Sequence, residues 1–259
     1  MAVRVVPLGS GSKGNATLVE LGGTRILVDA GLSAKDIAQR LEAVGVAPAT
    51  ITCLLLTHEH HDHSRGVERF STKHKVPVAC SPETLEAMNL SYVHVARWHA
   101  FQPGQRFEVG DVTVDPFHVP HDAARPVGFL LRGHGVKVGI ATDLGHATTL
   151  VVERLRGCHV LMVEANHDDA MLRDGPYPWH LKQRVGGNQG HLSNDEAAAL
   201  VAAVATDECR AVILAHLSDQ NNTPALARKA ASMALADAGR TRLEMRIARR
   251  SRPTPAVVL

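Results

Sequence analysis

Residues Leu54–His63 have the sequence LLLTHEHHDH, in which an apolar segment runs directly into a cluster of metal-ligand side chains. His58, His60 and Asp62 alternate along the chain, so an extended segment would hold them on one side, whereas a helix would turn such neighbours to different faces. We therefore expect these ligands on a loop that leaves the end of a buried strand. With His63, four such residues occur within six positions. Composition alone rarely produces this density, so the stretch predicts a metal site rather than a solvated polar loop.

The composition is that of a globular protein with a sizeable core. The chain has 259 residues, of which 45% are hydrophobic and 21% are charged, values that are ordinary for a folded domain. No segment has the unbroken apolar length of a membrane span, and the N-terminus lacks an apolar core followed by a small-residue cleavage site. We expect a cytoplasmic protein that does not associate with membranes.

The net charge and the cysteine content argue against two further classes of protein, those that bind nucleic acid over their whole surface and those that depend on disulfides or thiolate metal sites. The net charge of +2 is too small to make the whole surface attract nucleic acid, so any polyanion would have to bind at local patches. The four cysteines form no Cys-x-x-Cys pair and lie at or near apolar segments, which favours buried thiols over a disulfide framework or a thiolate metal site.

The apolar periodicity predicts one α/β domain over residues 1–259. No low-complexity linker or long internal repeat divides the chain. The basic, proline-containing end, residues 249–259, is expected to fray rather than to form a nucleic-acid arm. Buried strands are expected at 51–56, 159–163 and 210–215, and the main helices at 34–44, 195–205 and 224–239.

A predicted hairpin supplies partners for the opening cluster. Segments 127–132 and 136–141 are joined by a Gly-His-Gly turn, so their pairing brings the approach to the first strand close to the exit from the second. His121 and Asp143 lie at these two points and are expected to be spatial neighbours. His118 is a rival to His121, but it is expected to belong to the preceding strand.

His216 ends a second apolar segment, 212–215, as His58 ends the first. Taken alone, it is best explained as a satisfied core histidine at the end of a strand. The pattern His-x-His-x-Asp-His, however, resembles the signature of the metallo-β-lactamase superfamily, whose fold is a four-layer αββα sandwich. This resemblance reverses the interpretation of His216, because the superfamily has a final histidine after such a strand.

The resemblance implies two divalent metal ions, with zinc and manganese as the leading candidates among several ions that suit histidine. His58, His60 and His121 are expected to hold one ion, Asp62, His63 and His216 the other, and Asp143 to bridge them. Two such cations would generate hydroxide near neutral pH and stabilise charge during hydrolysis. Asp62 and His191 are the candidates for transferring protons during the reaction. Asp29 is expected to orient the site without binding metal.

Four further segments of the chain resemble one family within this superfamily. That family is the YycJ (WalJ) family of bacterial metallo-β-lactamase-fold proteins, which is related to ribonucleases Z and J and to the cyclic-phosphate phosphodiesterase PhnP. Members are regarded as exonucleases that act on double-stranded DNA from the 5′ end, which implies the same reaction here. The resemblance covers residues from about Val5 to Gly239. The segments are GSGSKGN at 9–15, EANHD at 164–168, GHLSN at 190–194 and HLSDQNN at 216–222.

The same segments supply candidate substrate contacts. A glycine-rich turn at 9–15 could cradle an anion, although such turns are more often only turns. The stretch 177–184, YPWHLKQR, interleaves aromatic and basic residues as nucleic-acid surfaces do, while a helix with one buried and one solvated face explains it equally well. The expected substrate-binding residues are Ser10, Ser12, Asn15, His167, Lys182, Arg184, Ser193, Asn221 and Asn222.

Two other functions compete with a nuclease. A small-molecule cyclic-phosphate phosphodiesterase would share every metal ligand, and the basic stretch at 177–184 is the only feature that separates it from a nuclease. A thioester or lactone hydrolase fits the Ser, Asn and His surroundings less well, and a purely regulatory module would be expected to have lost a ligand. The sequence is compatible with DNA or RNA as the partner and with a homo-oligomer, and it assigns no role to His61.

Overall fold

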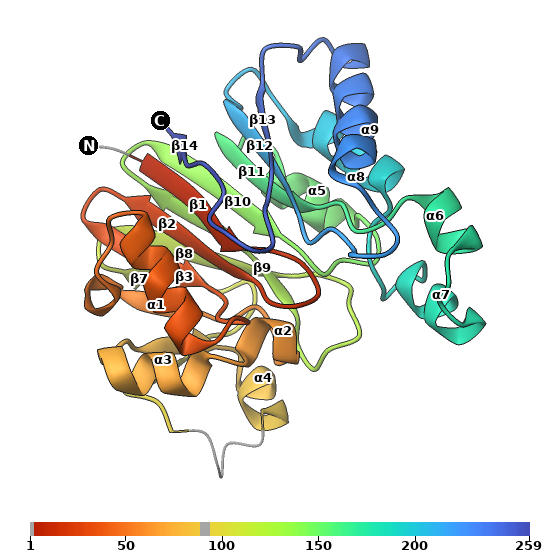
Figure 1. The fold of residues 1–259 in the computed structure, drawn as a ribbon. Helices are drawn as coiled ribbons and strands as arrows, with labels where there is room; N and C mark the ends of the chain where they lie inside the picture. The colour runs from red at the N-terminus through yellow and green to blue at the C-terminus, as the bar shows by residue number, and fades with distance from the viewer. Residues whose placement is uncertain (1–2, 89–93) are drawn as a thin grey trace.

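In the computed structural model, residues 3–88 and 94–259 are described, and their strands form two sheets of seven strands each that face one another (Figure 1). The first sheet has the order β14-β1-β2-β3-β4-β5-β6 and the second the order β13-β12-β11-β10-β9-β8-β7. In the first sheet the strands are β1 (Val3–Gly9), β2 (Ala16–Leu21), β3 (Thr24–Val28), β4 (Cys53–Leu55), β5 (Val78–Cys80), β6 (Trp98–Ala100) and β14 (Val257–Val258). In the second they are β7 (Phe107–Val109), β8 (Val112–His118), β9 (Val127–Gly133), β10 (Val136–Ala141), β11 (Val160–Glu164), β12 (Ala211–Ala215) and β13 (Glu244–Ile247).

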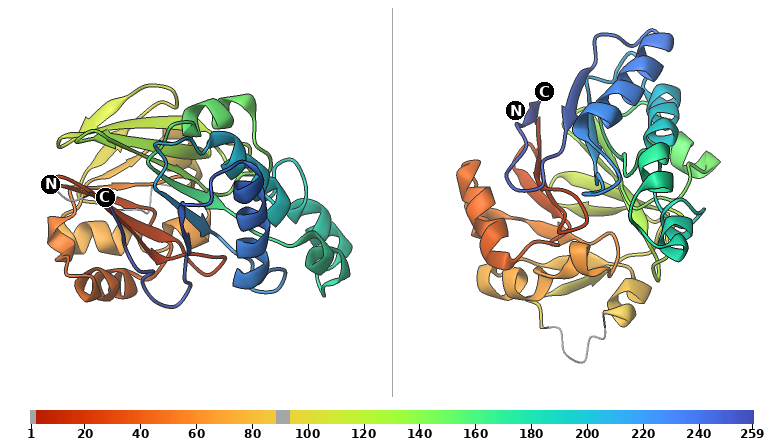
Figure 2. Two further views of the ribbon diagram at one scale, coloured as in Figure 1. Left: turned by 90° about the horizontal axis from the view of Figure 1, so that it is seen from above. Right: turned by 45° about the vertical axis from the view of Figure 1, so that its right-hand side comes forward.

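Helices cover the outer face of each sheet (Figures 1 and 2). The predicted helices at 34–44, 195–205 and 224–239 are confirmed, with boundaries that differ by at most two residues. The helices are α1 (Ala34–Ala43), α2 (His61–Ser64), α3 (Val67–His74), α4 (Pro82–Ala87), α5 (Thr149–Leu155), α6 (Asp169–Asp174), α7 (Trp179–Val185), α8 (Asn194–Val204) and α9 (Pro224–Asp237), with one 3-10 turn at Pro48–Thr50. None of them, within residues 3–88 and 94–259, is long and apolar enough to cross a membrane.

Three apolar layers hold the four structural layers together. Because successive side chains of a strand point to opposite faces, Ile213 of β12 packs between the two sheets with Phe129, whereas Leu214 packs under α5, α8 and α9. A third layer joins α1 and α3 to the first sheet through residues such as Leu54 and Phe70. Strands buried on both faces need continuous apolar sequence, which explains why 54–56 and 212–215 have it. The predicted αββα sandwich is confirmed.

The C-terminal end is ordered, so the prediction of a frayed tail at 249–259 is wrong. Val257 is buried and pairs with Val5, which makes β14 the edge strand beside β1 (Figure 1). The two strands are also adjacent in the views of Figure 2. Thr254 is also buried, and its N–H donates to the Pro7 carbonyl over 2.8 Å. The sequence gives a weak signal here, because the strand contains only two residues and follows a run of arginines and prolines.

Candidate metal centre

The candidate metal centre lies where parallel strands of both sheets end. In the first sheet β3 and β4 run parallel, with Asp29 directly after β3 and His58 shortly after β4. In the second sheet β10, β11 and β12 run parallel; Asp143 and His216 follow β10 and β12, and Glu164 is the last residue of β11. The carboxyl ends of parallel strands meet at one edge of a sheet, where open α/β folds bind their ligands. Residues far apart in the sequence therefore meet at this edge.

Three of these residues have left-handed backbone. Asp29, Asp143 and His216 have φ angles of 62°, 56° and 54°, a region that residues other than glycine seldom adopt. Each such residue turns the chain sharply away from its strand, so that its side chain stays over the strand ends. Local strain of this kind costs on the order of 1–3 kcal/mol per residue and is concentrated at functional sites.

Two groups of three side chains form around one buried aspartate. The ligand atoms of His58, His60 and His121 lie within 4.8 Å of one another, and so do those of Asp62, His63 and His216. They are two of four overlapping groups of potential ligands among the described residues, and they are the two sets that the family resemblance implies. We propose that each set holds one divalent metal ion.

Asp143 contacts members of both sets. Its carboxylate lies 3.2 Å from His63 Nε2, 3.8 Å from His121 Nε2 and 3.5 Å from His216 Nδ1. His121 and Asp143 are thus neighbours, as the hairpin geometry predicts, whereas His118 is exposed at the end of β8. This position supports the bridging role that we propose for Asp143.

Protein groups fix the orientation of the imidazole rings through their Nδ1 atoms. His121 Nδ1 donates a hydrogen bond to the Gly190 carbonyl over 3.0 Å, which leaves Nε2 of that ring without a proton in the neutral form. His63 Nδ1 lies 2.8 Å from an Asp29 oxygen, the orienting contact expected of Asp29. Metal-binding histidines typically have a carboxylate or carbonyl partner on the other ring nitrogen.

Glu164 is a buried acidic residue of the candidate site that the sequence patterns do not single out. Its buried carboxylate accepts from His191 Nδ1 at 2.8 Å and from His216 Nδ1 at 2.7 Å. The second carboxylate oxygen accepts from the backbone N–H of Leu144 at 3.0 Å and of Leu192 at 3.3 Å. One signal could have revealed it: an acidic residue closes the apolar strand between the two strands that deliver Asp143 and His216.

The donor set fits divalent cations. Within residues 3–88 and 94–259, His58 Nε2 is buried and has no hydrogen-bond partner. Leaving buried polar atoms unsatisfied is costly unless something binds them. Imidazole nitrogens and carboxylate oxygens without a cysteine suit zinc, manganese and similar ions, with zinc or manganese the expected occupants.

Asp62 does not lie on a loop as expected. Asp62 and His63 belong to α2, a single helical turn that begins after His60, so only His58 and His60 are carried by the extended segment. The turn directs Asp62 and His63 to the second set, and leaves His61 exposed on the outside. The alternation of residues does not reveal this change of backbone, because four residues are too few to show helical periodicity.

The centre opens into a pocket of about 210 Å³. Five of the proposed ligands line it, and His191 lies on its wall. Of the nine predicted substrate contacts, Ser12 and Arg184 reach this pocket, together with Tyr177 and Leu181 of the α7 region. No residue of α7 is fully buried, but Leu181 and Val185 are half-buried and line the pocket, so the helix has one partly buried face and one exposed face.

The other predicted contacts lie behind or beside the pocket. Ser10 and Asn15 bond to each other, and Asn15 Nδ2 also lies 3.3 Å from the Asp62 carboxylate. Ser193 caps α8, and Asn222 bonds to Asn194 and two backbone carbonyls. His167 and Asn221 are buried, whereas Lys182 donates to the Arg173 carbonyl on the surface. These contacts give most of the group a role in holding loops.

The two sets of ligands differ in protonation. Burial lowers the pKa of His58 well below its usual value and also lowers that of His121. For His63 and His216 burial acts in the same direction, but nearby carboxylates, Asp143 above all, raise the pKa well above the usual value. In the metal-free protein the neighbouring carboxylates therefore favour the protonated forms of His63 and His216.

Metal loading at pH 7 is expected to release these protons. A histidine must be neutral to bind metal, so loading both sites should displace about two protons, and the apparent affinity should rise with pH. Calorimetric titration with zinc in buffers of different ionisation enthalpy measures the number. A His121→Ala variant should still release protons and His216→Ala should release fewer. Equal heats in all buffers would contradict this charge assignment.

Comparison with known proteins gives matches over most of the chain. Residues 24–217 match the family model described as the beta-lactamase superfamily domain. The chain is 34% identical to an exodeoxyribonuclease YycJ of Bacillus anthracis over 241 residues, 92% of this chain and 91% of that protein. It is also 34% identical to exodeoxyribonuclease WalJ of Streptococcus pneumoniae, over 85% of this chain and 83% of that protein. The metallo-β-lactamase fold protein YhfI from Bacillus subtilis superposes with a TM-score of 0.78 at 17% identity, covering 100% of both chains.

Proposed function

Since this chain belongs to the beta-lactamase superfamily, and within it to the family of YycJ and WalJ, we propose that it is a two-metal nuclease. The proposed reaction is hydrolysis of phosphodiester bonds in double-stranded DNA from the 5′ end. The named relatives are exodeoxyribonucleases, which supports the substrate class. The fold itself implies a metal-dependent hydrolase.

One observation carries the proposal: two sets of His and Asp side chains meet at the buried Asp143 and open into one pocket. When bound, divalent cations there would lower the pKa of water and neutralise charge that develops at phosphorus. His58, His60 and His121 would hold one cation. Asp62, His63 and His216 would hold the other.

The remaining groups of the pocket act on protons and on the substrate. Burial would raise the pKa of Asp62, but hydrogen bonds from His216 and His63 hold it below its usual range, so this carboxylate is ionised and would act as a hydrogen-bond acceptor in the pocket rather than as a strong base. Burial would lower the pKa of His191, but Glu164 raises it, so His191 can donate a proton to the leaving oxygen. Ser12 and Arg184 line the pocket and would contact the phosphodiester.

A direct assay tests this function. Metal-loaded protein is incubated with 5′-labelled duplex DNA, single-stranded DNA, RNA and a cyclic nucleotide, each with and without chelator. We expect duplex DNA to be degraded progressively from its 5′ ends and chelation to abolish the reaction. Hydrolysis of the cyclic nucleotide alone would contradict the proposed nuclease function. It would instead support a small-molecule phosphodiesterase, which could use the same metal ligands.

A further inference from the structure

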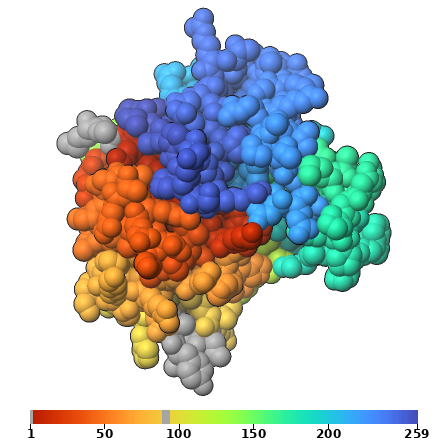
Figure 3. Space-filling model, in the orientation of Figure 1, coloured from red at the N-terminus to blue at the C-terminus, as the bar shows by residue number. Residues whose placement is uncertain are grey.

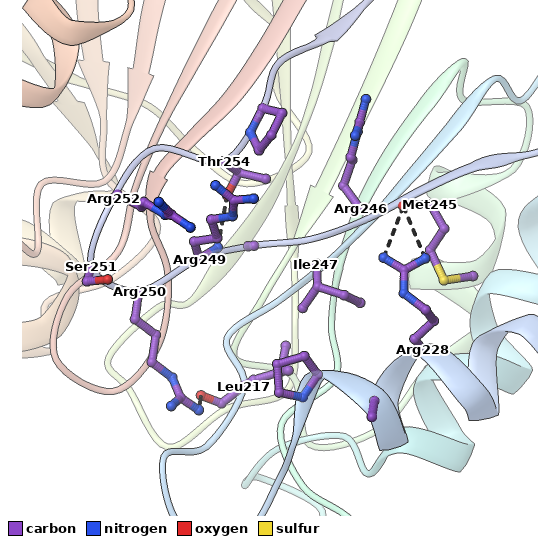
Figure 4. Close-up of a pocket in the computed structure, with 14 residues that line it drawn as sticks. Leu217, Arg228, Met245, Arg246, Ile247, Arg249, Arg250, Ser251, Arg252 and Thr254 are labelled. Atoms are coloured by element: carbon purple, nitrogen blue, oxygen red, sulfur yellow. Dashed lines mark hydrogen bonds between the residues drawn. The ribbon is translucent and has the colours of Figure 1, made fainter.

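A second cavity, of about 720 Å³, lies between α9, β13 and the segment that follows β13 (Figure 4). Its most unusual property is its charge, because five of its fourteen lining residues are arginines and none is acidic. They come from three different elements, so no single helix or loop accounts for the cluster (Figure 4). The arginines are Arg228, Arg246, Arg249, Arg250 and Arg252.

Most of this charge is not neutralised by the protein. In the described parts of the chain, Arg246 pairs with Glu244 and Arg250 with Asp219, but no ion pair includes Arg228, Arg249 or Arg252. All three are exposed. Clustered cations of one sign raise the local concentration of anions, and guanidinium groups bind phosphate oxygens through paired N–H donors. The cavity therefore favours a ligand with several phosphate groups.

The segment that carries Arg249 and Arg252 is held in place by its backbone. The Arg249 carbonyl accepts from the Ser10 N–H over 3.1 Å, and the Arg249 N–H donates to Thr254 Oγ1 over 2.9 Å. The Arg250 carbonyl accepts from the Arg40 guanidinium over 3.0 Å. Figure 3 shows the segment on the molecular surface beside the N-terminal residues. A site whose backbone is fixed beforehand loses less entropy when it binds.

The cavity adjoins the metal centre. Leu217 lines the arginine cavity, and the next residue, Ser218, lines the metal pocket. The Arg250 guanidinium donates to the carbonyls of both residues, at 3.2 and 2.5 Å. Ser10, which holds Arg249, also accepts from the His216 N–H over 2.8 Å. The arginines and the metal ligand His216 are thus fixed to the same two loops.

The metal pocket is too small for more than a short part of a nucleic acid, since its volume is about 210 Å³. The rest of any long substrate must lie on the surface next to it. We propose that the arginine cavity binds the phosphate backbone of the DNA beyond the phosphodiester being cleaved. This inference rests on the proposed nuclease function and adds to it a second contact, on the side of the pocket away from α7.

The test removes two charges that make no ion pair within the described residues. Arg249→Ala combined with Arg252→Ala keeps the backbone bonds of the segment. The matched control is Arg156→Ala with Arg242→Ala, which removes two exposed arginines outside the cavity. Binding of a fluorescent, phosphorothioate-protected duplex to the metal-loaded proteins is measured by anisotropy over a range of salt, so that binding is observed without cleavage.

We expect the cavity variant to bind the duplex at least about tenfold more weakly and its salt slope to fall by about 2. The control should bind like the wild type. Hydrolysis of bis(p-nitrophenyl) phosphate, which is too short to reach the cavity, should change less than about twofold. If the control variant lost duplex affinity to the same extent, the effect would reflect general electrostatic attraction. That result would contradict the proposal that the arginine cavity is a DNA-binding site.

A third measurement separates DNA from a small polyanion. If the cavity variant lost binding of inorganic pyrophosphate but kept duplex binding, the cavity would be a small-anion site and the proposal would be wrong. Failure of the nuclease function is distinguishable, because it would appear as no cleavage by the wild type. The binding comparison between the two double variants would still decide the role of the arginines.

Discussion

Asp143→Ala is expected to abolish phosphodiester hydrolysis. Among residues 3–88 and 94–259, Asp143 is the one carboxylate that contacts members of both ligand sets, so its removal would leave the two proposed cation sites without a shared anion. Metal-ion catalysis supplies several kcal/mol of charge stabilisation, and each 1.36 kcal/mol corresponds to a factor of ten. We expect a fall in kcat of roughly 10³-fold or more, with a reduced metal content measured by elemental analysis.

The matched control is another fully buried aspartate outside the centre. Asp115 is buried among three arginines, at 3.0 to 3.1 Å from Arg106, Arg132 and Arg154. Asp115→Asn should lower the melting temperature, because it weakens a buried charge network, yet it should keep its full metal content. Asp143→Ala should show the opposite pattern, with folded circular dichroism and lost metal. Retained phosphodiesterase activity in the Asp143→Ala variant would contradict the two-metal model.

Glu164→Gln is expected to weaken metal binding although Glu164 is not itself one of the proposed ligands. The charged carboxylate accepts hydrogen bonds from His191 and His216; burial would raise its pKa, but the two histidines, His191 first, lower that pKa to about 2. A glutamine side chain has nearly the same shape but no charge. Its NH₂ group would also place a hydrogen-bond donor opposite N–H groups that now donate to the carboxylate. Changes to such orienting carboxylates typically cost 10–100-fold in metal affinity. Metal titration with a chromophoric chelator measures this loss.

The role of Glu164 as a positioning residue can be separated from a merely structural one. Asp29 makes the equivalent contact on His63, in the same ligand set, whereas His121 of the other set depends on a backbone carbonyl. Both Glu164→Gln and Asp29→Asn should therefore weaken one of two metal-binding phases and spare the other. Uniform weakening of both phases, together with a lower melting temperature, would indicate general unfolding instead.

The buried strands could be predicted from the sequence, and so could the candidate ligands at their ends, although His216 became a candidate only through the family resemblance. A strand buried on both faces must be apolar throughout, and a ligand at its end interrupts that run abruptly, as at His58 and His216. The hairpin predicted the position of Asp143, because the two-residue turn His134-Gly135 between the paired Gly133 and Val136 fixes its register. These features are local, so they are visible in the order of residues.

The features that escaped prediction depend on tertiary contacts. Glu164 closes an apolar strand and would usually face water, and only the arrival of His191 and His216 makes it a buried acceptor. Ser10 and Asn222 have side chains suited to substrates, but their hydrogen bonds are satisfied by loops that come from far along the chain. The arginines near the C-terminus resembled a solvated tail, because β14 is too short to be recognised.

The left-handed residues at the strand ends also limit how far this protein can be stabilised. Glycine at Asp29, Asp143 or His216 would relieve backbone strain, but each such change would delete a proposed ligand or its support. Selection for thermostability alone would therefore favour glycine at these positions and yield an inactive protein, which is the usual trade-off between stability and activity. Stabilising substitutions belong in the apolar layers and on the surface, away from the three positions at which activity demands an unfavourable backbone.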